Sequence, residues 1–445
     1  MPSAEECRVP RFPETSTRHG RSSYPRTRIP VKPLHYTAVI ALAFYQSAFA
    51  QAPAAFEDVA ALNASDLLLA ETLLGPSHRV RNQVITDGYM AHFEIDTDFG
   101  TFKAIGVPQA KQRITEAQAI RKLVETSKSD LFAEGLKRSI EQPIDAVKNI
   151  VKSPVTSLKR APKTVGHFFS KVGSSIERGV NKVQESGNDG QAPTASEVGS
   201  TAKNIVGFDK AKLDTAKQLG VDPYSDNIRL QEEMEKVTWA FFAGGLPLRI
   251  GAAVASAGVA VAATNMVGIP EETYALTQSE LALRGQQSLT AMGLKSADIQ
   301  AFQIQPKLST TRRHRIVKSL EALPKAAGRG RIILLANSCA TAEQADFLVA
   351  ALSMLESRQR AGAADYKDLQ VFGRLPGATT ASGTLEIPAP VDYVTWTEQV
   401  AEFAQRDDLG TSAKLLVHTG KLSPSAVAGF TSTGWKILAV PYPAR

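Results

Sequence analysis

Apolar positions in the N-terminal part of the chain, 51–142, first follow helical spacing and then alternate as they do in strands. The helical spacing covers 57–74. Three runs with strand character follow it, at 79–86, 89–96 and 99–105. Asp87-Gly88 joins the first two runs and favours a two-residue hairpin turn. Helical patterns between 115 and 141 offer a cover for one face of such a sheet, so we expect a small α+β domain with a three-strand meander.

Short apolar runs and capped helical patterns alternate along the C-terminal part of the chain, 309–445. Five runs are suited to buried strands, at 331–336, 369–374, 384–388, 414–418 and 435–440. Residues that cap or open a helix precede the helical patterns: Ser309, Thr341 with Gln344, Thr395 with Glu398, and Ser423 with Pro424. Strands and helices that alternate with short connections favour right-handed crossovers between parallel strands. We therefore expect a three-layer α/β domain with a mostly parallel sheet.

The middle region, 201–308, is predicted to be helical and rich in Ala and Gly. Asn227 is placed to cap a helix that begins near Ile228. Residues 250–269 follow, twenty positions without a charge, which is long enough to span a membrane. Ala and Gly contribute little transfer free energy, however, so two interpretations stay open. The segment is a helical hairpin buried in the fold, or it inserts into a membrane.

Residues 143–183 form a basic amphipathic pattern with apolar residues at steps of three and four. The segment contains eight basic and two acidic residues. Its candidate contact residues for an anionic membrane surface or another envelope protein are Lys159, Arg160, Lys163, Phe168, Phe169, Lys171, Arg178 and Lys182. The alternative is a helix that packs on its own protein and leaves its Lys/Arg face in water. Residues 184–200 have almost no bulky apolar side chain, and we expect a flexible linker there.

The leader, 1–50, ends in the pattern of an export signal. A short apolar run precedes Ala48-Phe49-Ala50, and small residues at these positions suit a signal peptidase, so cleavage is expected after Ala50. We interpret 31–50 as the signal peptide and 1–30 as an artefact of gene-start assignment, with a genuine extended leader as the alternative. The expected location is the periplasm or the outer-membrane surface.

Charge and cysteine content change this picture little. The formal net charge is +7, but the leader carries seven basic and three acidic residues, so the mature chain carries +3. The basic segment also lacks interleaved stacking aromatics, and we expect no nucleic-acid partner. Cys339 is the one cysteine outside the leader, so the mature chain cannot form an internal disulfide.

Catalytic chemistry has one weak candidate pair. Cys339 and His418 each follow a predicted strand, where ligands of α/β sheets bind, and an imidazole can activate a thiol. A lone cysteine after an apolar run is more often a small buried hydrophobe. The histidines have no metal-ligand spacing, and no glycine-rich loop suits a cofactor. We therefore expect no metal, no cofactor and no enzymatic activity.

Three phrases of the chain resemble recurring pieces of a family of uncharacterised exported bacterial proteins. They are LLGPSHRVRN with DGYMAHFEIDTDFGTFKAIG, LGVDPYSDN with WAFFAGG, and SPSAVAGFTSTGWKI. The resemblance implies export and shared organisation, and the family has no established activity. We expect an exported, non-enzymatic binding or assembly module. The alternatives are a membrane-active protein that inserts 250–269, and a hydrolase or transferase that uses the C-terminal strand-end loops.

Overall fold

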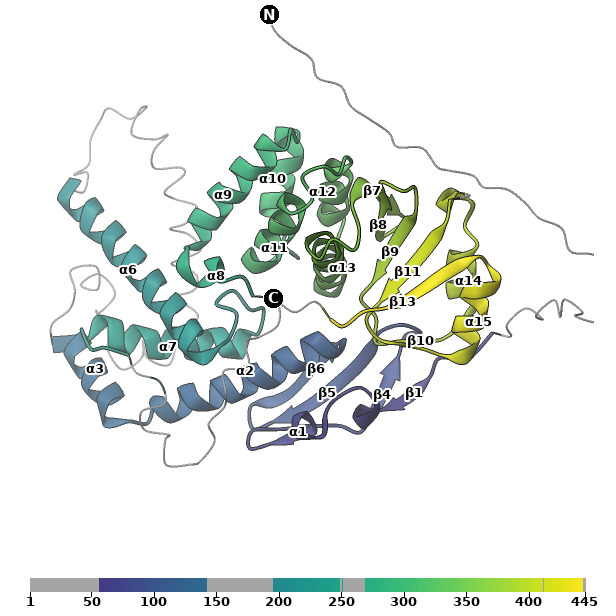
Figure 1. Cartoon of the computed structure of the whole chain (residues 1–445). Helices are drawn as coiled ribbons and strands as arrows, with labels where there is room; N and C mark the ends of the chain where they lie inside the picture. Colours follow the sequence, from purple (N-terminus) through teal and green to yellow (C-terminus); the bar gives the residue numbers. More distant parts are fainter. Residues whose placement is uncertain (1–55, 142–194, 249, 251–268, 411, 443–445) are drawn as a thin grey trace, which may run out of the picture. The chain divides into compact units, whose positions relative to one another are not determined.

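The computed structural model describes residues 56–141, 195–248, 250, 269–410 and 412–442 (Figure 1). They belong to one unit of the chain, Pro53–Arg445, and combine helices with two main sheets in an α+β mixture. The predicted leader, the predicted basic segment with its eight candidate contact residues, and 251–268 of the predicted apolar segment lie outside the described residues.

The N-terminal sheet is antiparallel throughout. Its strands are β1 (Ala61–Asn63), β2 (Leu74–Gly75), β3 (His78–Val80), β4 (Gln83–Thr86), β5 (Ala91–Thr97) and β6 (Gly100–Ile105). The order is β1-β4-β5-β3-β2, and β6 pairs with β5. His92 of β5 pairs with Ile85 of β4 and with Ile105 of β6, so β4 and β6 flank β5 on opposite edges. The expected meander is present within this larger sheet.

The predicted helix at 57–74 is wrong. The segment contains β1, a 3-10 turn (Ala64–Asp66) and the four-residue helix α1 (Ala70–Leu73) before β2. Ala64 and Leu68 are buried in the core of the sheet. The edge of β4 offers backbone hydrogen bonds to β1, and tertiary pairing of this kind overrides a weak helical preference.

Helix α2 (Val107–Thr126) packs against β5 and β6 and also against α7 (Ile228–Ala243). α3 (Asp130–Glu141) and α6 (Ala195–Leu219) pack against α7 as well. The predicted cap of α7 is confirmed, because the side chain of Asn227 accepts a hydrogen bond from the backbone of the helix. α6 begins inside the segment that we expected to be a linker.

Six further helices lead to the C-terminal sheet: α8 (Glu272–Ala275), α9 (Gln278–Ala291), α10 (Ser296–Ile304), α11 (Thr310–Glu321), α12 (Arg329–Asn337) and α13 (Ala342–Arg360). Ser309 and Thr341 cap α11 and α13 as predicted. The predicted strand at 331–336 is wrong, because this run forms α12. Leu334 is 53% exposed while the neighbouring apolar residues are buried, so the run has the one-sided burial of a helix.

The C-terminal sheet is mixed, which corrects the expectation of a mostly parallel one. Its order is β13-β11-β9-β8-β7, built from β7 (Tyr366–Phe372), β8 (Leu375–Thr380), β9 (Leu385–Ala389), β11 (Lys414–His418) and β13 (Trp435–Ala439). β9, β11 and β13 are parallel, whereas β8 is antiparallel to both β7 and β9. Gly373 and Arg374 alone connect β7 to β8, and so short a connection permits only an antiparallel hairpin.

Two helices pack against different strands of this sheet. α13 contacts β8 and β9, while α15 (Pro424–Ser432) contacts β13 and α14 (Glu398–Ala404). Ser423 caps α15 as predicted, but α14 is capped by Thr397 instead of Thr395. A separate pair of short parallel strands, β10 (Tyr393–Val394) and β12 (Lys421–Leu422), follows β9 and β11 along the chain.

Gly429→Ala tests the close packing of α15. An added Cβ would lie 2.1–2.4 Å from the indole of Trp396, whose side chain is buried. We expect a loss of about 1–3 kcal/mol in the free energy of unfolding, measured by urea denaturation. Gly330→Ala in α12 is the control, because a Cβ there meets open space. Equal stability of the two variants would contradict this packing.

Candidate ligand-binding cavity

A cavity of about 650 Å³ opens between the N-terminal sheet, α2, the turn at 222–226, α11, α13 and the C-terminal sheet. Its apolar lining comes mainly from the C-terminal part of the chain: Ile387, Val391, Val394, Phe403, Leu416 and Phe430. Ala389 and Val391 lie at and just beyond the carboxyl end of β9, the end at which parallel strands usually present ligands. The cavity therefore combines a strand-end location with apolar walls.

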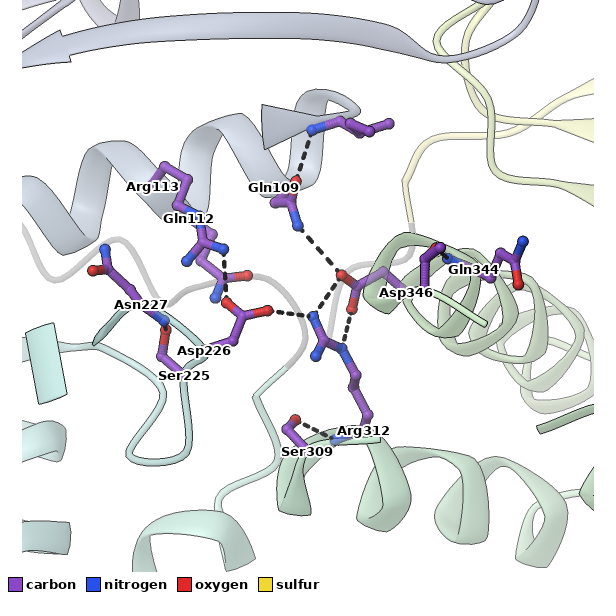
Figure 2. A network of polar contacts seen from close by, with 12 residues as sticks. Gln109, Gln112, Arg113, Ser225, Asp226, Asn227, Ser309, Arg312, Gln344 and Asp346 are labelled. Atoms are coloured by element: carbon purple, nitrogen blue, oxygen red, sulfur yellow. Dashed lines mark hydrogen bonds and ion pairs between the residues drawn. The ribbon is translucent and has the colours of Figure 1, made fainter. Parts of the chain in front are cut away.

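A chain of ion pairs forms a polar wall, in which Asp226, Arg312 and Asp346 line the cavity and Arg113 supports Asp226 from behind the lining (Figure 2). Arg312 of α11 donates from Nε to Oδ1 of Asp346 at 2.6 Å and from Nη2 to Oδ2 of Asp346 at 2.8 Å. The same Nη2 lies 3.1 Å from Oδ2 of Asp226. Arg113 of α2 reaches Oδ1 of Asp226 at 2.6 Å from the other side. Three ion pairs in sequence thus join helices α2, α11 and α13 to the turn at 222–226.

Glu116 extends the network into the interior. Its side chain is fully buried and accepts hydrogen bonds from Gln112, Ser225 and Asn227, besides its ion pair with Arg113. Four donors around one carboxylate satisfy a group that would otherwise be costly to bury. The turn that carries Ser225 and Asn227 is thereby held against α2.

The electrostatics of the network favour the charged forms. Burial opposes ionisation of Asp226, but the charges of Arg113 and Arg312 outweigh it and hold the pKa of Asp226 below its ordinary value. Burial likewise opposes the charge of Arg312, and the contacts to Asp346 and Asp226 raise its pKa overall. The wall is therefore a set of fixed, compensated charges.

Asp222 is a buried acid that lines the cavity without such compensation. It is 7% exposed. Its Oδ1 accepts hydrogen bonds from Oγ1 of Thr311 at 2.6 Å and from the backbone N–H of Tyr224 at 2.9 Å. Burial raises the pKa of Asp222 to about 6, although these two hydrogen bonds act in the opposite direction. Asp222 therefore changes charge close to neutral pH.

Asp392 fixes the N-terminal part of the structure to the C-terminal part. Its carboxylate accepts hydrogen bonds from the backbone N–H of Ala91 at 2.9 Å, from that of Val107 at 3.0 Å and from the hydroxyl of Tyr442 at 2.6 Å. Val107 is the first residue of α2, so Asp392 caps this helix from a distant part of the chain. Gly106, with φ +90°, turns the chain into that position.

The structure brings one member of the predicted Cys339/His418 pair to the cavity. Cys339 follows α12, lines the cavity and is buried, and its thiol contacts the carbonyl of Leu335 at 3.6 Å. Burial raises the pKa of this thiol and so favours its neutral form, and the smaller effect of Arg374 acts in the opposite direction. His418 is buried at the end of β11, outside the cavity lining, with Nδ1 2.9 Å from the carbonyl oxygen of Gly420.

The residues of the polar wall have only faint signals in the sequence. The turn containing Asp222 and Asp226 is recognisable from Pro223 and Asn227, but nothing in its spacing indicates that its carboxylates meet arginines. Within the described ranges, no three His, Cys, Asp or Glu side chains gather closely enough to hold a metal ion.

No protein-family model, curated protein or solved structure matches this chain. The resemblance to exported bacterial proteins stays a prediction, and function is inferred from the cavity.

Asp222→Asn tests the uncompensated acid through the pH dependence of stability. The folded-state pKa of about 6 lies above the ordinary value of 3.8, so protonation favours folding and ionisation of Asp222 costs stability as pH rises through 6. At pH 8 we expect the variant to be more stable than the parent, by on the order of 2–3 kcal/mol, because the amide carries no charge. Below pH 4 the two should converge.

Urea unfolding at both pH values measures the difference. Asp226→Asn in the same turn is the control with opposite sign: the pKa of Asp226 is lowered by its arginines, so its ionised form stabilises the fold at pH 8. A parent and an Asp222→Asn variant with equal stability at pH 8 would contradict the assignment.

Proposed function

We propose that this protein is a binding protein for a small, largely apolar molecule that it holds in the central cavity. The observation that carries the proposal is the cavity itself, because about 650 Å³ lies within the range of small-molecule sites. Most of its lining surface is apolar, as is usual for such sites, although about half of the lining residues are polar or charged.

The rigidity of the polar wall supports a preformed site. The side chains of Arg113 and Arg312 are each 13% exposed and hold carboxylates from separate segments. Asp392 holds α2 against the C-terminal part at the same time. Movement of α2, α11, α13 or the turn at 222–226 would separate these partly buried charge pairs. A wall of this kind holds a cavity open, and a preformed cavity lowers the ordering cost of binding.

A hydrolase or transferase has weaker support. Burial favours the neutral thiol of Cys339, and it also lowers the pKa of His418, which is not part of the cavity lining. We therefore propose a binding role for the cavity in preference to a reaction at this pair.

The membrane-active alternative concerns residues 250–269, of which 251–268 lie outside the described residues. In the described part of the chain, no helix combines the length and apolar character needed to cross a membrane. The two described ends of the apolar segment belong to the fold: Ile250 packs against the core cluster around α7, and Ile269 is buried.

Ala350→Trp tests the cavity as the binding site. Ala350 lines the cavity on the same face of α13 as Phe347 and Ser353, so an indole there would occupy it. We expect N-phenyl-1-naphthylamine, a neutral apolar fluorophore, to bind the parent with one site and the variant at least tenfold more weakly. Fluorescence titration measures both affinities.

Ala301→Trp is the matched control, because Ala301 is exposed on α10 and does not line the cavity. Circular dichroism and thermal unfolding establish that both variants are folded. Binding to folded Ala350→Trp with unchanged affinity would place the site elsewhere and overturn the proposal.

We also propose that the protein works outside the cytoplasm, on the basis of the apolar run and the small residues that end at Ala50. Fractionation of the native cells, with mass spectrometry of the N-terminus, tests this. We expect a chain that begins at Gln51 in the periplasmic or outer-membrane fraction. An uncleaved chain in the cytoplasmic fraction would contradict export.

A further inference from the structure

We propose that the ligand of the cavity is an amphipathic organic cation, an amine with an apolar body, whose charged nitrogen binds beside Asp222. The inference rests on the proposed function and adds the chemical class of the ligand. It follows from the charges that line the cavity, from the burial of Asp222 and from the way its two carboxylate oxygens are used.

Asp222 has one carboxylate oxygen to spare. Both of its hydrogen-bond donors, the hydroxyl of Thr311 and the backbone N–H of Tyr224, are on Oδ1. Among the described residues, no donor contacts Oδ2 and no Lys, Arg or His forms an ion pair with Asp222. A carboxylate that is 7% exposed and lines a cavity can gain a counter-charge only from what enters that cavity.

The other acids of the lining differ from Asp222. Asp226 and Asp346 are paired with arginine, Asp87 lies 3.3 Å from His92, and Glu343 is exposed to solvent. Asp222 is thus the buried acid of the described lining that lacks a cation. A ligand ammonium would meet it in a water-poor site, where charge pairing is stronger than in bulk solvent.

The charge balance around Asp222 points the same way. The charged side chains that line the cavity are five acids, Asp87, Asp222, Asp226, Glu343 and Asp346, and four bases, Lys111, Arg312, Arg315 and Arg374. The charge of Glu116 disfavours ionisation of Asp222, and that of Arg312 favours it. One added cation reduces the excess negative charge, whereas an anion would increase it.

The apolar lining accounts for the rest of such a ligand. Ile387, Val391 and Phe430 of the lining come from the C-terminal part of the chain, and Asp222 comes from the turn between α6 and α7. A decyl chain gains about 0.8 kcal/mol for each methylene that it buries. The lining also contains Lys111, Arg315 and Arg374, which makes an anionic amphiphile the competing ligand.

Three decyl compounds of equal length separate these possibilities. Decylamine, 1-decanol and decanoate are titrated at pH 7.5 by calorimetry into the full mature chain, each below its micelle concentration. We expect decylamine to bind at least tenfold more tightly than 1-decanol, and decanoate most weakly. In Asp222→Asn the preference for the amine should fall to near one while the affinity for 1-decanol stays unchanged.

Asp87→Asn is the matched control, because it removes an exposed acid of the same lining and should leave the preference intact. Preference for decanoate, or an amine preference that survives in Asp222→Asn, would overturn the inference. If 1-decanol binds, Ala350→Trp blocks its binding and decylamine binds no more tightly than 1-decanol, the inference of a cationic ligand is wrong and the proposed binding function is retained. If none of the three compounds binds, the proposed function fails with it.

Discussion

The sharing of Asp226 between two arginines is the interaction on which the cavity depends most. Arg113 and Arg312 approach different oxygens of this carboxylate, from helices that belong to different parts of the fold. Removing one partner would leave a partly buried charge without its counter-charge. This costs more free energy than replacing the whole pair by apolar residues of similar size. The turn between α6 and α7 is therefore held in one position. Because Asp222 lies in that turn, the same contacts also place the buried acid of the described lining that has no ion pair.

Asp392 applies a similar constraint at the start of α2. The first residue of this helix receives its cap from the C-terminal part of the chain, and Arg113, six residues further along, reaches Asp226. One helix is thus fixed at two points to elements that lie far away in sequence. Gly420 leaves room for this junction, since a Cβ there would lie 2.2 Å from the carbonyl oxygen of Asp392. The N-terminal sheet and the C-terminal sheet can then share a cavity whose walls neither forms alone.

Local features of the fold are predictable from the sequence, whereas the site is not. Asn227, Ser309 and Ser423 each cap the predicted helix because a cap needs only the next three residues. The apolar run at 331–336 has no periodicity that would distinguish a strand from a helix. The sheet is mixed because β7 and β8 form an antiparallel hairpin, and the apolar pattern does not predict the direction of these strands. Arg312 lies 86 residues from Asp226. Nothing local records such a pairing, so the polar wall could be found only in three dimensions.

The cavity also has a cost that indicates function. Unfilled apolar space reduces stability by about 24 cal/mol for each Å³ where it stays dry, and buried ion pairs are often no better for stability than apolar residues of the same shape. A chain selected for stability alone would place larger side chains where Ala350 and Ala389 line the cavity. It would also replace Asp222, whose ionised form is disfavoured by burial. Residues that reduce stability are typical of functional sites, and Ala350, Ala389 and Asp222 all line this cavity.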